Sequence, residues 1–333
     1  YEGQIAEKMA TDLADHGSAV TLEAFNEYVA EDSRIVRGSY RGYDLVGMGI
    51  PAAGVLSIQA LQIMEKFEPS SMSEAEWFAV TGQALSLASR ELRVLGTDTA
   101  AARATSKDWA TELARQVAVP NTPRSTIGGS LLPPLQDRGD LFGGHTTHLS
   151  TADENGMFVS LTQTLGPTMG SKVVTPGLGF LYASTLGGYL GRMEPGERAR
   201  SNICPFMVLK DGEVILVLGA AGGGMIPPAI VHAITRVIDF GMSLPQALAE
   251  PRVAGARGGG YSAETSPGIG WTLAELEEMR GLGIEVTETP RSGAFGRVHG
   301  IQFEPATRTW IGAADPDWEG TARGPAMVRT RGR

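Results

Sequence analysis

The chain has 333 residues, of which 42% are hydrophobic and 20% charged, so it can bury a large core as one big domain or two smaller ones. Its formal net charge of -9 argues against a nucleic-acid partner, because affinity for phosphates comes largely from clustered Lys and Arg. A single cysteine, Cys204, excludes an internal disulfide framework and a multi-thiolate zinc site. No apolar run approaches the roughly 20 residues that cross a bilayer, which predicts no membrane span.

The chain begins at Tyr1 without an initiator Met, so we expect upstream residues to have been removed or to be absent from the sequence. The first 120 residues read as mainly helical. Residues 1–17 predict an amphipathic helix, and residues 37–54 predict a short strand with a Gly and Pro turn into the next helix. Other helix start signals stand at Thr21, at a Ser73 to Glu76 capping box and at Ser106.

Residues 118–144 are rich in Pro and Gly and carry no periodicity, which marks a surface loop or linker ending at His145. Hairpin patterns follow in TTHLSTA with MFVSLTQTL, in PFMVL with EVILVLG and in RVHGIQFE with TWIGAA. Helices are expected after Pro227 and Pro228 and after a capping box at Thr272.

The strand MFVSLTQTL has two different faces. Alternation places Phe158, Ser160, Thr162 and Thr164 on one face and Met157, Val159, Leu161 and Leu165 on the other. The first face is polar and is a candidate lining for a site.

The segment GGHTTHLST at 143–151 places hydroxyl residues directly behind the linker. Cleavage of the His145–Thr146 bond would give Thr146 a free α-amine, whose pKa near ~7.7 to 8.0 suits a general base beside its own hydroxyl. The alternative is a strand edge with ordinary threonine propensity. The pattern alone leaves both open.

The loop GAAGGGMI at 219–226 lacks the Lys of a phosphate loop and the spacing of a dinucleotide fingerprint. Glycines before a helix allow two backbone amides to converge as an oxyanion hole, or form a flexible loop that packs tightly. His145 and His148 point to opposite strand faces and predict no metal site. Cys204 reads as a buried structural residue, and paired carboxylates such as Glu277-Glu278 as surface charge.

The order of motifs resembles the gamma-glutamyltranspeptidase family of N-terminal nucleophile hydrolases over nearly the whole chain. The resemblance is carried by YEGQIAEKMATDL, DSRIVRGSYRGYDLVGMGIPAAGV, TTHLSTADENG, PGLGFLY, CPFMVLKDGEVILVLGAAGGGMI, VIDFGMSLPQALAEPRV and GAADP. It implies an α+β fold of the four-layer αββα sandwich type. It also implies a precursor cut between His145 and Thr146, with residues 1–145 as the C-terminal part of a large subunit and 146–333 as a small subunit, together one domain.

The resemblance further implies that Thr146 attacks an amide to form an acyl-enzyme, that Thr164 supports it, and that the amides of Gly222 and Gly223 form the oxyanion hole. It implies no cofactor. The expected partners are a small-molecule amide or peptide substrate and the two subunits of the precursor. Family members are often secreted or periplasmic, which favours those compartments, while the sequence itself leaves the compartment open.

The chain departs from the family at the positions that grip a glutamyl donor. Asparagine becomes Gly166, a Gln and an acidic pair become Thr185, Gly187 and Gly188, and paired serines become Ser201 and Asn202. The loss of each charge-assisted hydrogen-bond partner costs ~1.5 to 3 kcal/mol of binding free energy for a glutamyl donor. Glycine in place of a polar side chain would also enlarge the donor pocket and make it less charged.

The sequence therefore predicts an autoprocessed threonine amidohydrolase or acylase with a donor other than a standard gamma-glutamyl group. Two alternatives remain: a true gamma-glutamyl hydrolase or transferase acting on glutathione-like substrates, and an unprocessed pseudoenzyme.

Overall fold

A computed structural model of the chain describes residues 1–32, 34–94, 98–119, 144–185, 196–255, 260–291, 295–317 and 320–324. The α-helices are α1 (Gly3–Asp15), α2 (Leu22–Glu27), α3 (Gly54–Met64), α4 (Glu74–Val94), α5 (Asp98–Ala104), α6 (Lys107–Ala114), α7 (Ile226–Phe240), α8 (Leu244–Ala249) and α9 (Leu273–Gly281). The strands are β1 (Ile35–Tyr40), β2 (Tyr43–Met48), β3 (Gly144–Ala152), β4 (Phe158–Pro167), β5 (Phe206–Lys210), β6 (Glu213–Ala221), β7 (Val253–Gly255), β8 (Tyr261–Glu264), β9 (Val286–Thr289), β10 (Arg297–Glu304) and β11 (Thr309–Ala314).

The largest sheet has six strands in the order β1-β2-β5-β6-β10-β11, and every neighbouring pair in it is antiparallel. Strands β1 and β2 precede Thr146 and the other four follow it, so the two segments of the chain share one sheet. The expected hairpins β5–β6 and β10–β11 are confirmed.

Residues 35–48 form a two-stranded hairpin, so the expectation of one short strand there was wrong. The turn is made by Arg41 and Gly42, both with positive φ, at 47° and 78°. Two such residues form the tight turn that matches the twist of paired strands. Arg is not a usual residue for this turn, which is why the sequence pattern did not mark it.

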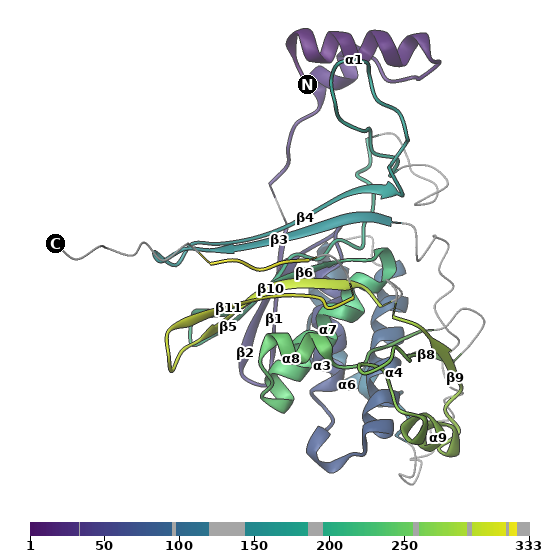
Figure 1. The fold of residues 1–333 in the computed structure, drawn as a ribbon, viewed down its shortest axis with the longest axis vertical. Helices are drawn as coiled ribbons and strands as arrows, with labels where there is room; N and C mark the ends of the chain where they lie inside the picture. The colour runs from purple at the N-terminus through teal and green to yellow at the C-terminus, as the bar shows by residue number, and fades with distance from the viewer. Residues whose placement is uncertain are drawn as a thin grey trace, which may run out of the picture.

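Helices α3 and α7 cover one face of the six-stranded sheet, and α4 packs against α3 (Figure 1). All 11 residues of α3 are buried, so this helix lies inside the helical layer and not at its surface. The core joins helix to sheet through side chains such as Ile58, Leu61, Phe206, Leu218 and Ile230. The residues that hold this layer together therefore come from both sides of Thr146.

The hairpin β3–β4 forms a second sheet, which lies on the other face, where β3 contacts β6 and β10 (Figure 1). Its turn is the expected one at Asn155 and Gly156. The Asp153 carboxylate accepts hydrogen bonds at 2.9 Å from the amides of Asn155 and Met157. This side-chain mimic of a backbone turn fixes the register of the two strands.

The polar face of β4 points inward to the six-stranded sheet, where the Ser160 hydroxyl donates to the Leu218 carbonyl at 3.1 Å. The apolar face points outward and leaves Val159 and Leu161, and Leu149 of β3, between 42% and 53% exposed. The described elements thus supply a helical layer and two stacked sheets, a mixed fold of helix and sheet.

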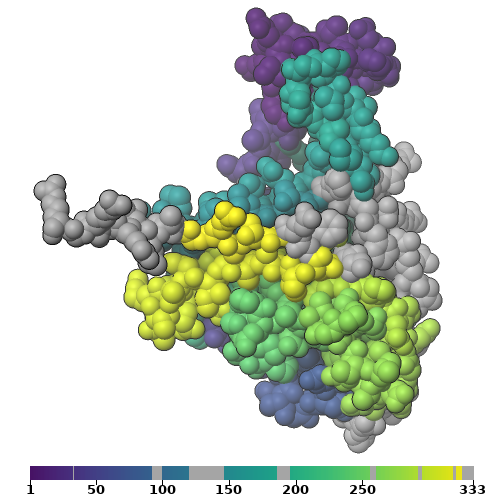
Figure 2. All heavy atoms as spheres, in the orientation of Figure 1, coloured from purple at the N-terminus to yellow at the C-terminus, as the bar shows by residue number. Residues whose placement is uncertain are grey.

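Helix α1 and the segment after β4 project together from the body of the molecule (Figures 1 and 2). The Thr175 hydroxyl donates to the Asp12 carboxylate at 2.7 Å and ties the two. Helix α1 forms as predicted, but Ile5 on its expected apolar face is 56% exposed. Within the described ranges no helix is both long and apolar enough for a membrane crossing.

The predicted helix starts are confirmed. Thr21 and Ser106 accept hydrogen bonds from the amides three residues on, at 3.1 and 3.2 Å. The capping boxes at Ser73 and at Thr272 both have their two reciprocal hydrogen bonds.

A third sheet, with the strand order β7-β8-β9, and helix α9 lie at the end of the molecule away from α1 (Figure 1).

Candidate active site

Thr146 and Thr164 lie directly opposite each other on β3 and β4. The Thr146 hydroxyl donates to Oγ1 of Thr164 at 3.0 Å, and the Gly166 amide donates to the same oxygen at 3.0 Å. Two donors therefore hold the Thr164 oxygen in place. The strand pattern that put Thr164 on the polar face is confirmed, and the pairing with Thr146 follows from the hairpin register.

The ladder is irregular just before this pair, with a register shift between Gly144 and Thr146. Such a bulge bends a strand locally and can redirect a side chain. The backbone of His145 lies within β3, and its side chain is outside the described residues, as is most of the predicted linker. In the uncut chain the Thr146 nitrogen is a peptide nitrogen, so it becomes a base only after the bond to His145 is broken.

The glycine loop lies between β6 and α7, which confirms the expected order of strand, loop and helix. Gly222 has φ 132°, and a Cβ there would lie 2.8 Å from the Cα of Gly296, so only glycine fits. Gly223 has φ 57° and open space at its Cβ position. Pro227 lies in the first turn of α7, as predicted.

Most of the predicted site residues meet at one pocket of about 610 Å³, a volume that includes the solvent space at its mouth. Thr146 and Thr164 lie on its wall beside Gly223, and among the described residues that line it none carries a charged side chain. The residues around the pocket are Thr146, Thr164, Thr185, Ala199, Ser201, Asn202, Ile203, Gly223 and Ile226. The sequence analysis did not name Ala199, Ile203 and Ile226 as site residues, although Ile226 is the last residue of the segment GAAGGGMI and could have been found from that position.

Gly166 does not line this pocket, and the expected enlargement is not found there. Its φ is +86°, and an added Cβ would lie 2.6 Å from the carbonyl oxygen of Ser184. The glycine makes room for the neighbouring chain, because residues 184–185 fill the space where a side chain would be. Gly187 and Gly188 lie outside the described residues.

Residues 201–203 form the rim of the pocket and are held by the segment before α3. The Ser201 amide donates to the Pro51 carbonyl at 2.9 Å, and the Ala53 amide donates to the Ile203 carbonyl at 3.0 Å. The Ser201 hydroxyl accepts from the Ile203 amide at 3.2 Å. The part of the chain before Thr146 thus positions a wall of the pocket.

His148 lies behind the threonine pair, buried against Gly219. Its ring nitrogens are 2.8 Å from the Thr162 hydroxyl and 2.9 Å from the Ser150 hydroxyl. Burial, with a smaller contribution from His299, lowers the pKa of His148 to about 4, so the ring is neutral at pH 7. Its contacts and its neutrality fit a structural role.

No group of three or more potential metal ligands occurs in the part of the chain that the structure describes. Cys204 is fully buried, as predicted, with its Sγ 3.4 Å from the Ser57 hydroxyl. Burial raises the pKa of its thiol to about 12, which makes it a poor nucleophile.

A buried ion network stands behind the glycine loop. Arg252 pairs with Asp315 at 2.5 Å and donates to the Gly296 carbonyl at 2.8 Å, and Gly296 in turn packs against Gly222. Arg291 pairs with Glu264 at 3.1 Å in the same network. Burial raises the pKa of Glu264 to about 7, against the charges of Arg291 and Arg252. The sequence motifs around 250–252 and 312–316 thus meet in space and support the loop.

Several known proteins are similar to this chain in sequence or in fold. The "Acylase ACY 1 proenzyme" of Pseudomonas sp. (strain SE83) is 30% identical over 352 aligned residues, which cover 100% of this chain and 57% of that protein. The "Glutathione hydrolase proenzyme" of Escherichia coli (strain K12) is 28% identical over 282 residues, covering 76% of this chain and 47% of that protein. The chain therefore spans about half the length of the curated relatives it matches.

The solved cephalosporin acylase from Bacillus halodurans superposes with a TM-score of 0.77 at 24% identity, covering 96% of this chain and 60% of that chain. At this identity the likeness establishes a common fold and no more. The family model described as Gamma-glutamyltranspeptidase matches residues 1–324. The chain belongs to the gamma-glutamyltranspeptidase family.

Proposed function

We propose that the full protein is an autoprocessed threonine amidohydrolase that acts as an acylase on a neutral acyl donor. The observation that carries this proposal is the 3.0 Å hydroxyl pair of Thr146 and Thr164 in a pocket that also contains Gly223. A nucleophile, a polar partner that fixes it and a loop with exposed backbone amides are the parts that acyl transfer needs.

Processing comes first in this proposal. The Thr146 hydroxyl attacks the carbonyl carbon of His145, the peptide C–N bond breaks, and the acyl group moves from nitrogen to oxygen as an ester. Water then hydrolyses the ester, which leaves a His145 carboxylate and a free α-amine on Thr146. Residues 1–145 become the C-terminal part of the large subunit and 146–333 the small subunit, joined by the shared six-stranded sheet.

Turnover uses the same oxygen. The α-amine of Thr146 takes the hydroxyl proton while Oγ1 attacks the substrate carbonyl, and Thr164 holds Oγ1 in position. The amides of Gly222 and Gly223 stabilise the negative oxygen of the tetrahedral intermediate. The ammonium group of Thr146 then protonates the leaving amine, and water hydrolyses the acyl-enzyme with the α-amine again acting as base.

The pocket chemistry supports a donor that lacks the charged groups of a glutamyl substrate. A free ammonium and carboxylate removed from water need oppositely charged or hydrogen-bonding partners. The lining offers three threonines, Ser201 and Asn202 together with apolar side chains. In this proposal Thr185, Ser201 and Asn202 bind the donor, together with Gly188, while Gly166 acts through Thr164. One of the relatives is named an acylase, in line with this choice.

The second candidate, a true gamma-glutamyl hydrolase, is favoured by the 28% identity to a protein named glutathione hydrolase. The test compares two chromogenic amides with five-carbon acyl chains, pentanoyl p-nitroanilide and gamma-glutamyl p-nitroanilide. We expect kcat/KM to be higher for the uncharged chain, with neither amide turned over by Thr146→Ala. A higher kcat/KM for the glutamyl amide would show that the donor is a gamma-glutamyl group. If Thr146→Ala turned the amides over as fast as the wild type, the proposal as a whole would be overturned.

The four-layer sandwich belongs to the same proposal. The exposed apolar face of β3–β4, with Leu149, Val159 and Leu161, is a surface on which a second helical layer could pack. Such a layer would complete the αββα order, since one helical layer and two sheets are already described.

A further inference from the structure

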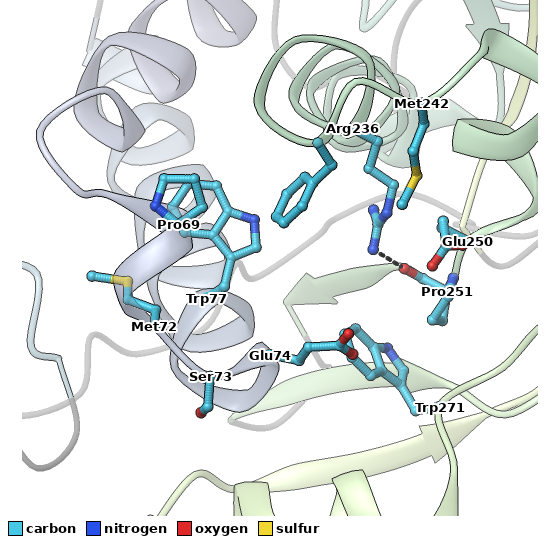
Figure 3. A pocket seen from close by; sticks show the side chains of 11 residues that line it. Pro69, Met72, Ser73, Glu74, Trp77, Arg236, Met242, Glu250, Pro251 and Trp271 are labelled. Carbon is cyan, nitrogen blue, oxygen red and sulfur yellow. Dashed lines mark hydrogen bonds between the residues drawn. The ribbon is translucent and has the colours of Figure 1, made fainter.

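A second pocket of about 490 Å³ lies at the other end of the helical layer and shares no residue with the Thr146 pocket. This volume includes the solvent space at its mouth. Its lining comes from both segments of the chain, with Glu74 and Trp77 before Thr146, and Arg236, Glu250 and Trp271 after it (Figure 3).

The walls of this second pocket are mainly aromatic and apolar. Figure 3 shows Trp77 on one side of the space and Trp271 on the other, with Met72 on the side of Trp77 and Met242 on the side of Arg236. Phe240 also lines the pocket, and its ring packs edge-on against Trp77 with centroids 6.3 Å apart. Aromatic faces attract cations as well as apolar groups.

The guanidinium of Arg236 is already engaged by the protein. It donates to the Pro251 carbonyl at 2.8 Å, the dashed line in Figure 3, and lies 3.2 Å from Nδ1 of His232. Burial lowers the pKa of Arg236 to about 10, while the charges of Glu250 and Glu74 act in the opposite direction. The Glu250 and Glu74 carboxylates thus lie near enough for their negative charges to favour the charged form of Arg236.

The carboxylates outnumber this cation. In Figure 3 the Glu74 side chain extends from the start of α4 toward Trp271. Burial raises the pKa of Glu74, and its hydrogen bond to Glu275 and the charges of Glu275 and Glu250 raise it further. Glu74 thus lies near both Glu275 and Glu250, and a positive charge beside Glu74 and Glu250 would relieve the repulsion between these two carboxylates.

We propose that this second pocket is a binding site for a small organic ammonium ion with an aromatic body. The ammonium group would lie between Glu74 and Glu250, and the aromatic ring between Trp77 and Trp271. Because its walls come from both sides of Thr146, a ligand there would bridge the two parts of the chain.

The test uses 2-phenylethylammonium as the probe, with 2-phenylethanol as its uncharged match and 3-phenylpropanoate as its anionic match. Binding is measured by titration calorimetry and by the fluorescence of the protein, since Trp77 and Trp271 are two of its five tryptophans. We expect saturable binding of the ammonium ion, at least about tenfold weaker binding of the alcohol and weaker binding still of the anion.

Variants assign the binding to this pocket. Glu250→Gln should weaken it roughly tenfold and the double variant Glu74→Gln with Glu250→Gln more, since each removes a carboxylate at nearly constant shape. Glu277→Gln makes the same change at an exposed position of α9 and should have no effect. Thr146→Ala should bind the probe as the wild type does. Equal affinity for amine and alcohol, unchanged binding in the double variant, or no saturable binding would overturn the proposal.

Discussion

The two pockets of this molecule differ in chemistry and in how they are built. The residues described in the lining of the Thr146 pocket supply hydroxyls, an amide and glycine and no charged side chain, whereas the second pocket sets Glu74, Glu250 and Arg236 among aromatic rings. The first suits a reaction in which charge appears only in the transition state. The second suits a ligand that already carries a charge.

The difference also concerns position along the chain. Thr146 and Thr164 are neighbours through one hairpin, and the glycine loop ends a strand beside them. The second pocket gathers residues from Pro69 to Trp271 through tertiary packing alone. The reacting groups thus come from local motifs, whereas residues 201–203 of the same pocket and the whole of the second pocket depend on tertiary packing.

The largest expected effect is that of Thr146→Ala. Turnover and self-cleavage should fall by at least about a thousandfold, because the nucleophile and the future base are the same residue. Steady-state rates with the pentanoyl amide measure this. Thr147→Ala is the matched control, since Thr147 is the adjacent, exposed residue on the opposite strand face, and it should remain active. A variant without Thr146 that still turned over would contradict the account.

Gly222→Ala and Gly223→Ala should come next and should differ from each other. At Gly222 the new Cβ would meet Gly296 at 2.8 Å with φ 132°, so we expect about a hundredfold lower kcat and a loss of stability of about 2 kcal/mol. At Gly223 the Cβ has open space and φ 57°, so about 1 kcal/mol of strain is expected. Denaturant unfolding and rates measure both. Equal effects would argue against the packing of Gly222 on Gly296.

Thr164→Val should lower kcat by about 10- to 100-fold with little change in KM, because it removes the acceptor that fixes the Thr146 hydroxyl at 3.0 Å. Thr164→Ser keeps that oxygen and should recover most of the rate. If the valine variant changed KM alone, Thr164 would be a substrate contact and not a partner of the nucleophile.

These expectations show what sequence can and cannot supply. The hairpins β3–β4, β5–β6 and β10–β11 and the capping boxes at Ser73 and Thr272 were predicted because each depends on local alternation or on turn residues, whereas the Thr146–Thr164 pair was expected from the family resemblance. The outward apolar face of β4 was not predicted, because a hydrophobicity pattern alone does not say which face meets the core. The close approach of Ser184 to Gly166 depends on a long-range contact, and the second pocket has no motif.

His148 gives a pH-dependent prediction. Its folded pKa of about 4 lies below the ordinary value of 6.5, so between these pH values the unfolded chain binds a proton that the native state does not. His148 therefore costs stability as pH falls through this window. Urea unfolding of His148→Gln at pH 7 and pH 5 should show a smaller acid loss than the wild type, since the other titrating groups are common to both. If the wild type and the variant lost the same free energy of unfolding between pH 7 and pH 5, the result would contradict a neutral, buried His148 ring.

The smallest effect is expected at the second pocket. Glu250→Gln should leave kcat/KM on the pentanoyl amide within about twofold, because Glu250 shares no wall with Thr146 and an isosteric change perturbs packing little. A tenfold loss of kcat/KM would show that the two pockets are energetically coupled and do not act independently.

The most direct test of the central claim is intact-mass spectrometry of the purified full-length protein beside its Thr146→Ala variant. We predict two wild-type fragments, one with Thr146 as its first residue, and a single uncut variant chain. A single uncut wild-type chain would leave Thr146 without its α-amine base. That result would contradict an autoprocessed hydrolase and favour an unprocessed protein that keeps only the fold.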